Sequence, residues 1–265
     1  MIEVRTNRAR NLLVLFCVFL GGKSMITGEV NMNIWAVGTD DGKSTYEIRR
    51  KWGEEGKKAL VIELYPTISV ENCGVLDVST MHLINHVNDF GWKEMRIVNL
   101  YANVITKKPS VSELQENSLA YIEEILEEED IKAYDIVIAW GNSLLTHKGT
   151  TNVKIDLLSM LEEKGLDKNV KCISVEGISM KSIGVHPLYL GLHYPREKWN
   201  LIDYPLKESL EALVQSEKRD KAEKGKKVTN TAKKKGKTEK GENHEHKNQD
   251  VGSVENVKTG QSVVD

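Results

Sequence analysis

Polar and aromatic side chains follow four predicted strands, at the point where each strand ends. They lie at Tyr65-Pro66-Thr67, at residues 99–103, at Trp140-Gly141-Asn142 and at His186-Pro187. An Asn side chain supplies both hydrogen-bond donors and acceptors, which reading the edge of a polar ring requires. Pro187 restricts His186 toward an extended conformation, and an imidazole held in this way can donate to an anionic oxygen or transfer a proton near neutral pH. These residue types predict a ligand site with His186 as a candidate catalytic group, although Trp140-Gly141-Asn142 by itself is equally typical of a strand-ending turn.

Alternating strands and helices between residues 33 and 215 must position these side chains. Strands are expected at residues 44–52, 59–65, 95–101, 135–140 and 170–175, and helices at residues 77–90, 110–129, 151–164 and 205–215. This alternation is typical of an α/β fold with a largely parallel sheet and helices on both faces, in which ligands lie at the carboxyl ends of the strands. We therefore expect a three-layer α/β sandwich with a mostly parallel, four-stranded central sheet.

The net charge of −2 is the sum of three unlike segments. Residues 1–24 carry four Lys or Arg and one Glu. Residues 25–215 carry 20 Lys or Arg and 29 Asp or Glu, so this segment is acidic. Residues 216–265 carry 13 Lys or Arg and nine Asp or Glu, so this segment is basic. The middle segment holds the alternating elements, so we predict a single α/β domain there. The last segment is rich in Lys, Gly and Thr, and it cannot bury enough apolar surface to offset its chain entropy. It is therefore predicted to be a disordered basic tail.

The first 24 residues have three interpretations. Three Arg precede an apolar run at residues 12–20, as in a signal peptide, but no small-x-small cleavage site follows. Gly21-Gly22-Lys23-Ser24 stands directly before Met25, as a purine-rich ribosome-binding sequence would read if it were translated in frame. We expect a start-site overrun before Met25, with a targeting segment or a genuine N-terminal extension as the alternatives.

Composition and spacing argue against several classes of protein and of site. No apolar run reaches the roughly 18–20 residues that span a bilayer, and three widely spaced Cys exclude a disulfide framework and a Cys-based zinc site. Residues 38–44 end in Gly-Lys-Ser but are one residue short of a phosphate-binding loop. His82 and His86 share a helix face but lack the Glu of a metalloprotease motif. We expect a cytoplasmic protein with no membrane segment, metal site or cofactor.

The charge distribution also limits the partners. An acidic body does not attract nucleic acid over its whole surface. Contact with DNA or a nucleotide therefore needs a local groove in the body, or it uses the Lys-rich tail. Contacts through the tail are expected to be non-specific and to weaken with salt.

Five motifs in order are similar to those of a bacterial and phage family, domain-of-unknown-function family 1643. They are Leu64-Tyr65-Pro66-Thr67, Asp77 with Thr80, Val98-Asn99-Leu100-Tyr101-Ala102, Ala139-Trp140-Gly141-Asn142 and His186-Pro187-Leu188-Tyr189-Leu190. The resemblance covers about residues 44–200. The first motif of the family is usually Leu-Asn-Pro-Ser/Thr, so Tyr65 here replaces its Asn. The acidic Asp-Asp-Pro-Thr segment is also altered, to Leu76-Asp77-Val78-Ser79-Thr80.

The layout also resembles the uracil-DNA glycosylase superfamily. That resemblance implies that Tyr65-Pro66-Thr67 is the water-positioning loop and that His186 stabilises the departing base. If the domain acts on a base, we expect Tyr65 to stack on the flipped base and Asn99 and Asn142 to read its edge. The usual acidic or amide residue is missing from the first loop. Glu63 lies inside the predicted strand, so Asp77, ten residues beyond Thr67, is the candidate catalytic carboxylate.

Two functional hypotheses follow. The first is an α/β domain that binds nucleic acid or a nucleobase, in the form of a glycosylase-like hydrolase. The alternative is a non-catalytic metabolite-binding or interaction module of a phage or mobile-element system. The first requires that Tyr65, Asn99, Asn142 and His186 line one cleft.

Overall fold

The computed structural model describes residues 2–4, 28–107, 109–114, 117–177 and 184–218. Most of the expected N-terminal segment and nearly all of the Lys-rich tail lie outside these residues. All ten candidate site residues lie within them.

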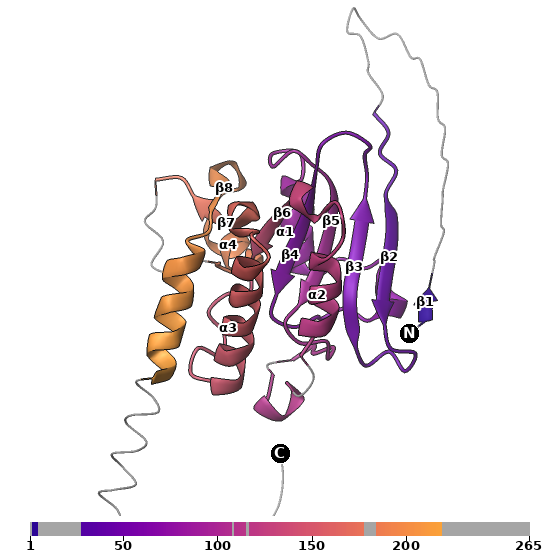
Figure 1. Ribbon diagram of the computed structural model, residues 1–265. Coiled ribbons are helices and arrows are strands. Elements are labelled where there is room, and N and C mark those ends of the chain that lie inside the picture. Colours follow the sequence, from indigo (N-terminus) through magenta and orange to yellow (C-terminus); the bar gives the residue numbers. More distant parts are fainter. Residues whose placement is uncertain (1, 5–27, 108, 115–116, 178–183, 219–265) are drawn as a thin grey trace, which may run out of the picture. The chain divides into compact units, whose positions relative to one another are not determined.

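Eight strands of the described residues form one mixed sheet, in the order β1-β2-β3-β5-β4-β6-β7-β8 (Figure 1). Their bounds are Ile2–Val4 (β1), Asn33–Gly38 (β2), Thr45–Lys51 (β3), Lys57–Glu63 (β4), Trp92–Asn99 (β5), Tyr134–Ile138 (β6), Val170–Val175 (β7) and Trp199–Asp203 (β8). The middle strands β5, β4, β6 and β7 run parallel to one another, and antiparallel strands flank them on both sides. The α/β class is confirmed, but the sheet has eight strands rather than the four expected.

The strand expected at residues 44–52 belongs to an antiparallel hairpin. Only residues 39–44 join β2 to β3, whereas parallel neighbours need a crossover of about a dozen residues or more. β3 then pairs antiparallel with β5, where Glu47 lies opposite Val98. The hairpin therefore widens the sheet beyond the parallel strands, and β2 has no counterpart among the expected strands.

Helices cover both faces of the sheet and make three layers (Figure 1). The helices are Val78–His86 (α1), Leu119–Leu126 (α2), Lys148–Glu163 (α3), Pro187–His193 (α4) and a last helix at residues 206–218. α2, α3 and the last helix share a core cluster with Leu60 and Ile62 of β4, whereas α1 and α4 share one with Ala59 and Val61. Helices cover both faces of β4, so apolar side chains are favourable on both of its faces and its sequence is a continuous apolar run rather than an alternating one. No described helix is long and apolar enough to cross a membrane.

Two helices begin differently from the expectation. The capping box at Ser110 and Glu113 forms, but it opens only a short 3-10 turn, because the backbone leaves helical angles at the buried Leu114. The helix proper begins nine residues later, at Leu119. His186 and Pro187, expected in a rigid loop, open helix α4, in which His186 is the N-cap. Pro is well suited to the first helical position, where its missing N–H is not needed and its φ is already helical.

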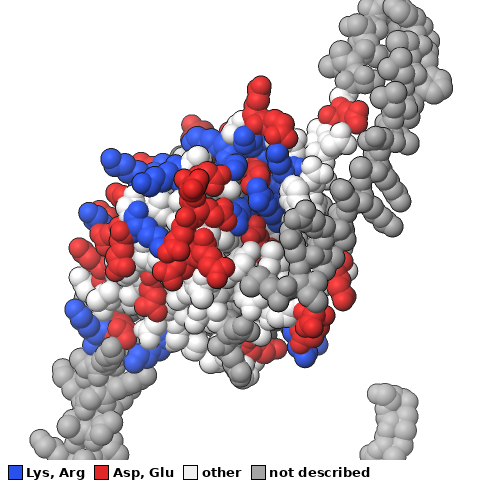
Figure 2. Space-filling view, turned by 45° about the vertical axis from the view of Figure 1, so that its right-hand side comes forward, with Lys and Arg blue, Asp and Glu red and all other residues white. Residues whose placement is uncertain are grey.

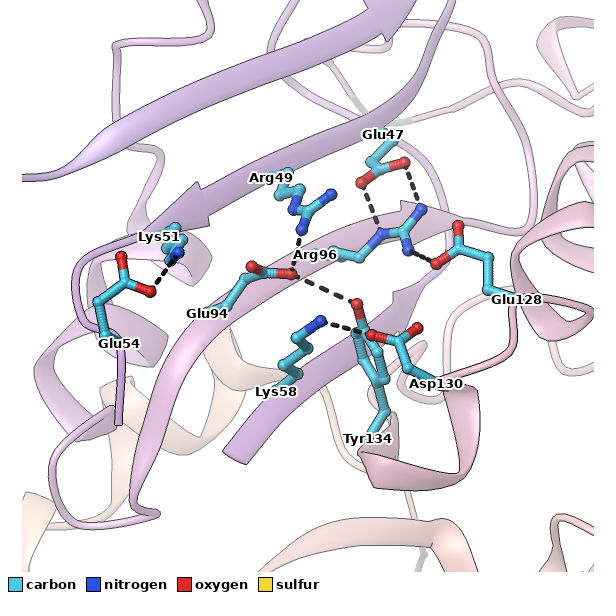
Figure 3. Close-up of polar contacts among 10 residues, drawn as sticks. All are labelled: Glu47, Arg49, Lys51, Glu54, Lys58, Glu94, Arg96, Glu128, Asp130 and Tyr134. Atoms are coloured by element: carbon cyan, nitrogen blue, oxygen red, sulfur yellow. Dashed lines mark hydrogen bonds and ion pairs between the residues drawn. The ribbon is translucent and has the colours of Figure 1, made fainter. Parts of the chain in front are cut away.

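Charged side chains form a network on the face of the sheet that α2 covers. On the side of the molecule seen in Figure 2, acidic and basic side chains lie in adjoining groups. Figure 3 shows the pairs that join β3 to β5: Arg96 donates twice to Glu47, over 2.7 and 3.0 Å, and once to Glu128, over 2.6 Å. Glu94 accepts from Arg49 over 2.8 Å. None of the candidate site residues belongs to this network.

Candidate functional site

A cavity of about 880 Å³ lies at the carboxyl ends of the parallel strands β4 and β6. Its walls come from the end of β4 and the loop after it, the N-terminal end of α1, the turn after β6, and α4. These segments meet because neighbouring parallel strands end at the same edge of the sheet, where the chain turns toward the next helix. The volume is within the range of small-molecule sites.

The structure brings seven of the ten candidate residues together in this cavity. The seven are Tyr65, Thr67, Asp77, Trp140, Gly141, Asn142 and His186. Pro66 and Pro187 are buried next to lining residues in the chain. Asn99 is not a lining residue: it ends β5, lies opposite Glu63 in the sheet and is 4% exposed. The expectation that four residues share one cleft therefore holds for Tyr65, Asn142 and His186 but is wrong for Asn99. A role of Asn99 in reading a base edge is not carried forward, and the contact surface for a ligand comes from the other strand ends and from α4.

His186 lines the cavity, and its Nε2 lies 3.9 Å from Oε1 of Glu63. Its Nδ1 accepts a hydrogen bond from the Leu188 backbone N–H over 3.3 Å, as an N-cap side chain does. The neutral ring therefore carries its proton on Nε2. Burial lowers the pKa of His186, and the charge of Asp77 acts in the opposite direction. At neutral pH the Nε2–H group is thus a hydrogen-bond donor on an uncharged imidazole.

Glu63 is a lining residue of the cavity that the sequence analysis did not select as a candidate. It is the last residue of β4, and its Oε1 is buried with no hydrogen-bond partner among the described residues. Burial, with a smaller contribution from Asp77, raises the pKa of Glu63 to about 8. At neutral pH the group is therefore a carboxylic acid, which can donate a hydrogen bond. The available signal was one acidic residue at the end of an apolar strand.

Asp77 ties the first loop to helix α1. It is the N-cap of α1, and its Oδ1 accepts from the Thr80 backbone N–H over 2.8 Å. Its other carboxylate oxygen accepts from the Thr67 hydroxyl. The carboxylate is thus fixed in orientation while it faces the cavity. A carboxylate held in this way can orient water or a ligand hydroxyl group.

Gly141 allows the end of β6 to approach the start of α4. Its φ is +67°, in the left-handed region, and a Cβ atom built on it would lie 2.9 Å from Cβ of His186. The Gly141 N–H donates to the Gly184 carbonyl over 2.9 Å. Glycine is therefore needed here both for the backbone conformation and for the contact with His186.

Aromatic and aliphatic side chains form much of the remaining wall. Tyr65, Trp140, Tyr189 and Tyr194 line the cavity, together with leucines of α4. None of the described lining residues is Lys or Arg. Such a wall suits a flat, largely uncharged ring better than a polyphosphate, because no described cation offsets phosphate charge.

Metal ligands do not cluster in the part of the chain that the structure describes: no group of three or more His, Cys, Asp or Glu there could hold an ion. His86 is buried and stacks on Trp199 with ring centroids 4.0 Å apart. Its two ring nitrogens contact the backbone oxygens of His82 and Arg196. This histidine is thus part of the packing between α1 and the segment before β8.

Comparisons with curated proteins and with solved structures find no match. One family model matches residues 45–188, which make up more than half of the chain and include Glu63, Asp77 and His186. The match agrees with the resemblance found in the five sequence motifs. The chain therefore belongs to the family described as Protein of unknown function (DUF1643).

Proposed function

We propose that the cavity binds a nucleobase or nucleoside and that the chain hydrolyses its N-glycosidic bond, as a glycosylase-like enzyme. The observation that carries the proposal is the meeting of Glu63, Asp77 and His186 in one cavity with aromatic walls, at the carboxyl ends of parallel strands. Aromatic walls favour a flat ring by stacking. The three polar side chains supply the donors and the carboxylate that breaking a bond to that ring requires.

In the proposed reaction His186 and Asp77 have different roles. The bond between C1′ of the sugar and the base nitrogen breaks, and its electron pair leaves with the base. His186 Nε2–H donates to the atom of the base on which negative charge develops. Asp77, fixed by Thr67 and Thr80, orients the water molecule that adds to C1′. One proton of this water ends on the base, so the products are a free base and a free sugar hydroxyl.

The test is base release by the full chain from duplex DNA, single-stranded DNA and free nucleosides that carry modified and unmodified bases. Abasic sites and released bases are both measured. His186→Ala and Asp77→Asn are expected to lower the rate by about 10²-fold or more, the scale of losing one preorganised group. Asp156→Asn, on the exposed face of α3, is the control and is expected to act as the unchanged protein. Equal rates in all four proteins, or no released base from any substrate, would contradict the proposal.

A second candidate is a binding module without catalysis. The observation in its favour is the exposed apolar surface of α4 at the cavity: Leu188, Tyr189 and Leu192 are 38%, 48% and 68% exposed. Exposed apolar groups beside a pocket are typical of ligand grooves and of contacts with other proteins. Saturable binding of a base or nucleoside without any product would favour this candidate.

A further inference from the structure

We infer that Glu63 and His186 form a pair of hydrogen-bond donors that holds a single acceptor atom of the base, and that Glu63 gives its proton to the base as the glycosidic bond breaks. This inference rests on the proposed function, which counts Glu63 among the polar groups of the cavity but gives it no step of its own. It makes Glu63 the general acid of the site. His186 then acts as the second donor to the same atom.

The distance between the two groups fits a shared acceptor. His186 Nε2 and Glu63 Oε1 are 3.9 Å apart. This is too long for a hydrogen bond between them, but an acceptor atom about 2.9 Å from each would complete a triangle. A carbonyl oxygen has two lone pairs, so it can accept from both donors at once. The ligand atom that fits best is therefore a carbonyl oxygen on the edge of the ring.

Glu63 has no other described partner that would explain its burial. Its side chain is 8% exposed and its Oε1 is unpaired in the described structure. A buried polar atom without a partner lowers stability, and it calls for an explanation such as a catalytic role. A ligand that supplies the missing acceptor accounts for the carboxyl group at this position.

The groups that face Glu63 keep it in the acid form. Asp77 approaches from α1, and its negative charge opposes ionisation of Glu63. The other titratable lining residues are Tyr65 after β4, and Tyr189 and Tyr194 in and after α4, besides His186 itself. No described lining residue carries a positive charge that would stabilise the Glu63 carboxylate. The pair therefore consists of two donors at neutral pH, and it becomes one donor and one acceptor when Glu63 ionises.

The proposed step is balanced. As the bond from C1′ to the base nitrogen breaks, its electron pair leaves with the base and the Glu63 proton moves to the shared acceptor atom. Water adds to C1′ and releases one proton, which restores the Glu63 acid. The overall change is addition of one water molecule across the glycosidic bond, with no oxidant, reductant or metal.

The first experiment measures binding, without turnover. The full chain is titrated calorimetrically with cytosine, uracil and hypoxanthine at about pH 6.5 and about pH 9.5, on either side of the Glu63 titration. The unchanged protein is expected to lose about 10-fold or more in affinity at the higher pH, because an ionised Glu63 repels the carbonyl oxygen. Glu63→Gln keeps an N–H donor at both pH values, so its loss should be smaller. Ionisation of the ligand itself is common to both proteins and cancels in the comparison.

The second experiment measures turnover. The kcat/KM of the unchanged protein is expected to fall above about pH 8, as Glu63 loses its proton. The kcat/KM of Glu63→Gln should be lower by about 10²-fold and should not fall further over this pH range. A 4-nitrophenyl riboside, whose leaving group needs no proton, should restore most of the rate of Glu63→Gln. His186→Asn keeps a side chain suited to the N-cap of α4 but is too short to reach the same atom, and it should lose affinity at both pH values. Asp156→Asn is the control for both experiments.

The outcomes separate this inference from the proposed function. Base release with an unchanged rate or an unchanged pH profile in Glu63→Gln overturns the acid role and leaves the hydrolase standing. Glu63-dependent binding without release from any substrate overturns the acid step and the hydrolase together, and leaves only the donor pair. The donor pair itself is overturned if none of the three bases binds, or if both proteins lose the same affinity with pH.

Discussion

The side chain of Glu63 is buried, so water solvates the charge of its carboxylate poorly. An ordinary Glu, with a pKa of 4.5, is ionised at neutral pH, whereas the pKa of this one is raised to about 8. Between these two values the folded protein retains a proton that the unfolded chain releases. Folding stability therefore falls as the pH rises through this window, and the loss is complete above about pH 8.

Glu63→Gln is expected to remove this pH-dependent penalty. Below about pH 4.5 the variant and the unchanged protein should have similar free energies of unfolding. Above about pH 8 the variant should be more stable, by about 5 kcal/mol at most. Urea unfolding at a series of pH values measures the difference. Glu163→Gln, on the exposed side of α3, is the control and should show no such trend. A constant difference across the series would show that Glu63 is not buried as an acid.

At the scale of the elements, the junction of β6 with α4 places His186. The chain turns at Gly141 with a positive φ, and the backbone of His186 lies against it. Helix α4 then begins at Pro187, with His186 as its cap. The orientation of the imidazole thus depends on a close approach between two elements that are more than 40 residues apart in the chain.

Gly141→Ala tests this junction, with Gly165→Ala as its matched control. Both glycines have φ near +66°, so both substitutions carry the conformational cost of about 1 kcal/mol. Only at Gly141 does the new Cβ meet His186, whereas nothing lies within 4 Å at Gly165. Gly141→Ala should therefore lower the melting temperature more than Gly165→Ala and also weaken binding of a base. Equal effects of the two substitutions would rule out the close approach.

A second prediction at this scale concerns how much the ion pairs between β3 and β5 contribute to the free energy of unfolding. Arg96→Leu leaves the buried Glu47 carboxylate without its cationic partner and with only the Tyr121 hydroxyl as a donor, and should lower the free energy of unfolding by about 3 kcal/mol or more. Lys164→Met breaks an ion pair with Glu127, which is 63% exposed, and should cost less than about 1 kcal/mol. Chemical denaturation of the two variants compares them. Similar losses would mean that the pairs in Figure 3 are no more important than surface pairs.

At the scale of the whole molecule, contact with DNA is expected to depend on the Lys-rich tail. Residues 25–215 carry 20 basic and 29 acidic side chains, whereas residues 216–265 carry 13 and 9. The face in Figure 2 has acidic groups beside its basic ones, rather than a continuous basic surface. A chain that ends at residue 218 should therefore bind duplex DNA more weakly than the full chain, whose affinity should fall steeply with salt. Fluorescence anisotropy at several salt concentrations measures both, and equal affinities would place the DNA contact in the body.

The sequence by itself determined the class of fold and seven of the residues that line the cavity. Period-two and apolar-run patterns depend on local burial, so they located β3 to β7. Helical spacing of apolar residues and cap signals located α1, α2, α3 and the last helix, although α2 begins later than expected. The position of each polar stretch at a strand end was also readable, because strand ends are marked by Pro, Gly and Asn. In a parallel sheet such ends meet at one edge, and this placed Tyr65, Trp140 and Asn142 in the same site.

The tertiary structure alone decided the size of the sheet and the chemistry of the site. The antiparallel strands β1, β2 and β8 were missed because strand preference toward the edges of a sheet depends on the neighbours that the side chains pack against, rather than on a local period. Asn99 lies outside the cavity wall because the end of β5 is covered, which no pattern within the strand reveals. The sequence placed Glu63 in a strand but did not show that its side chain is buried. The burial comes from the packing of the layers around the end of β4, and it disfavours the ionised form of the carboxyl group. Burial is a property of the assembled layers, so the pKa of this carboxyl group, and the role that follows from it, could not be read from the sequence.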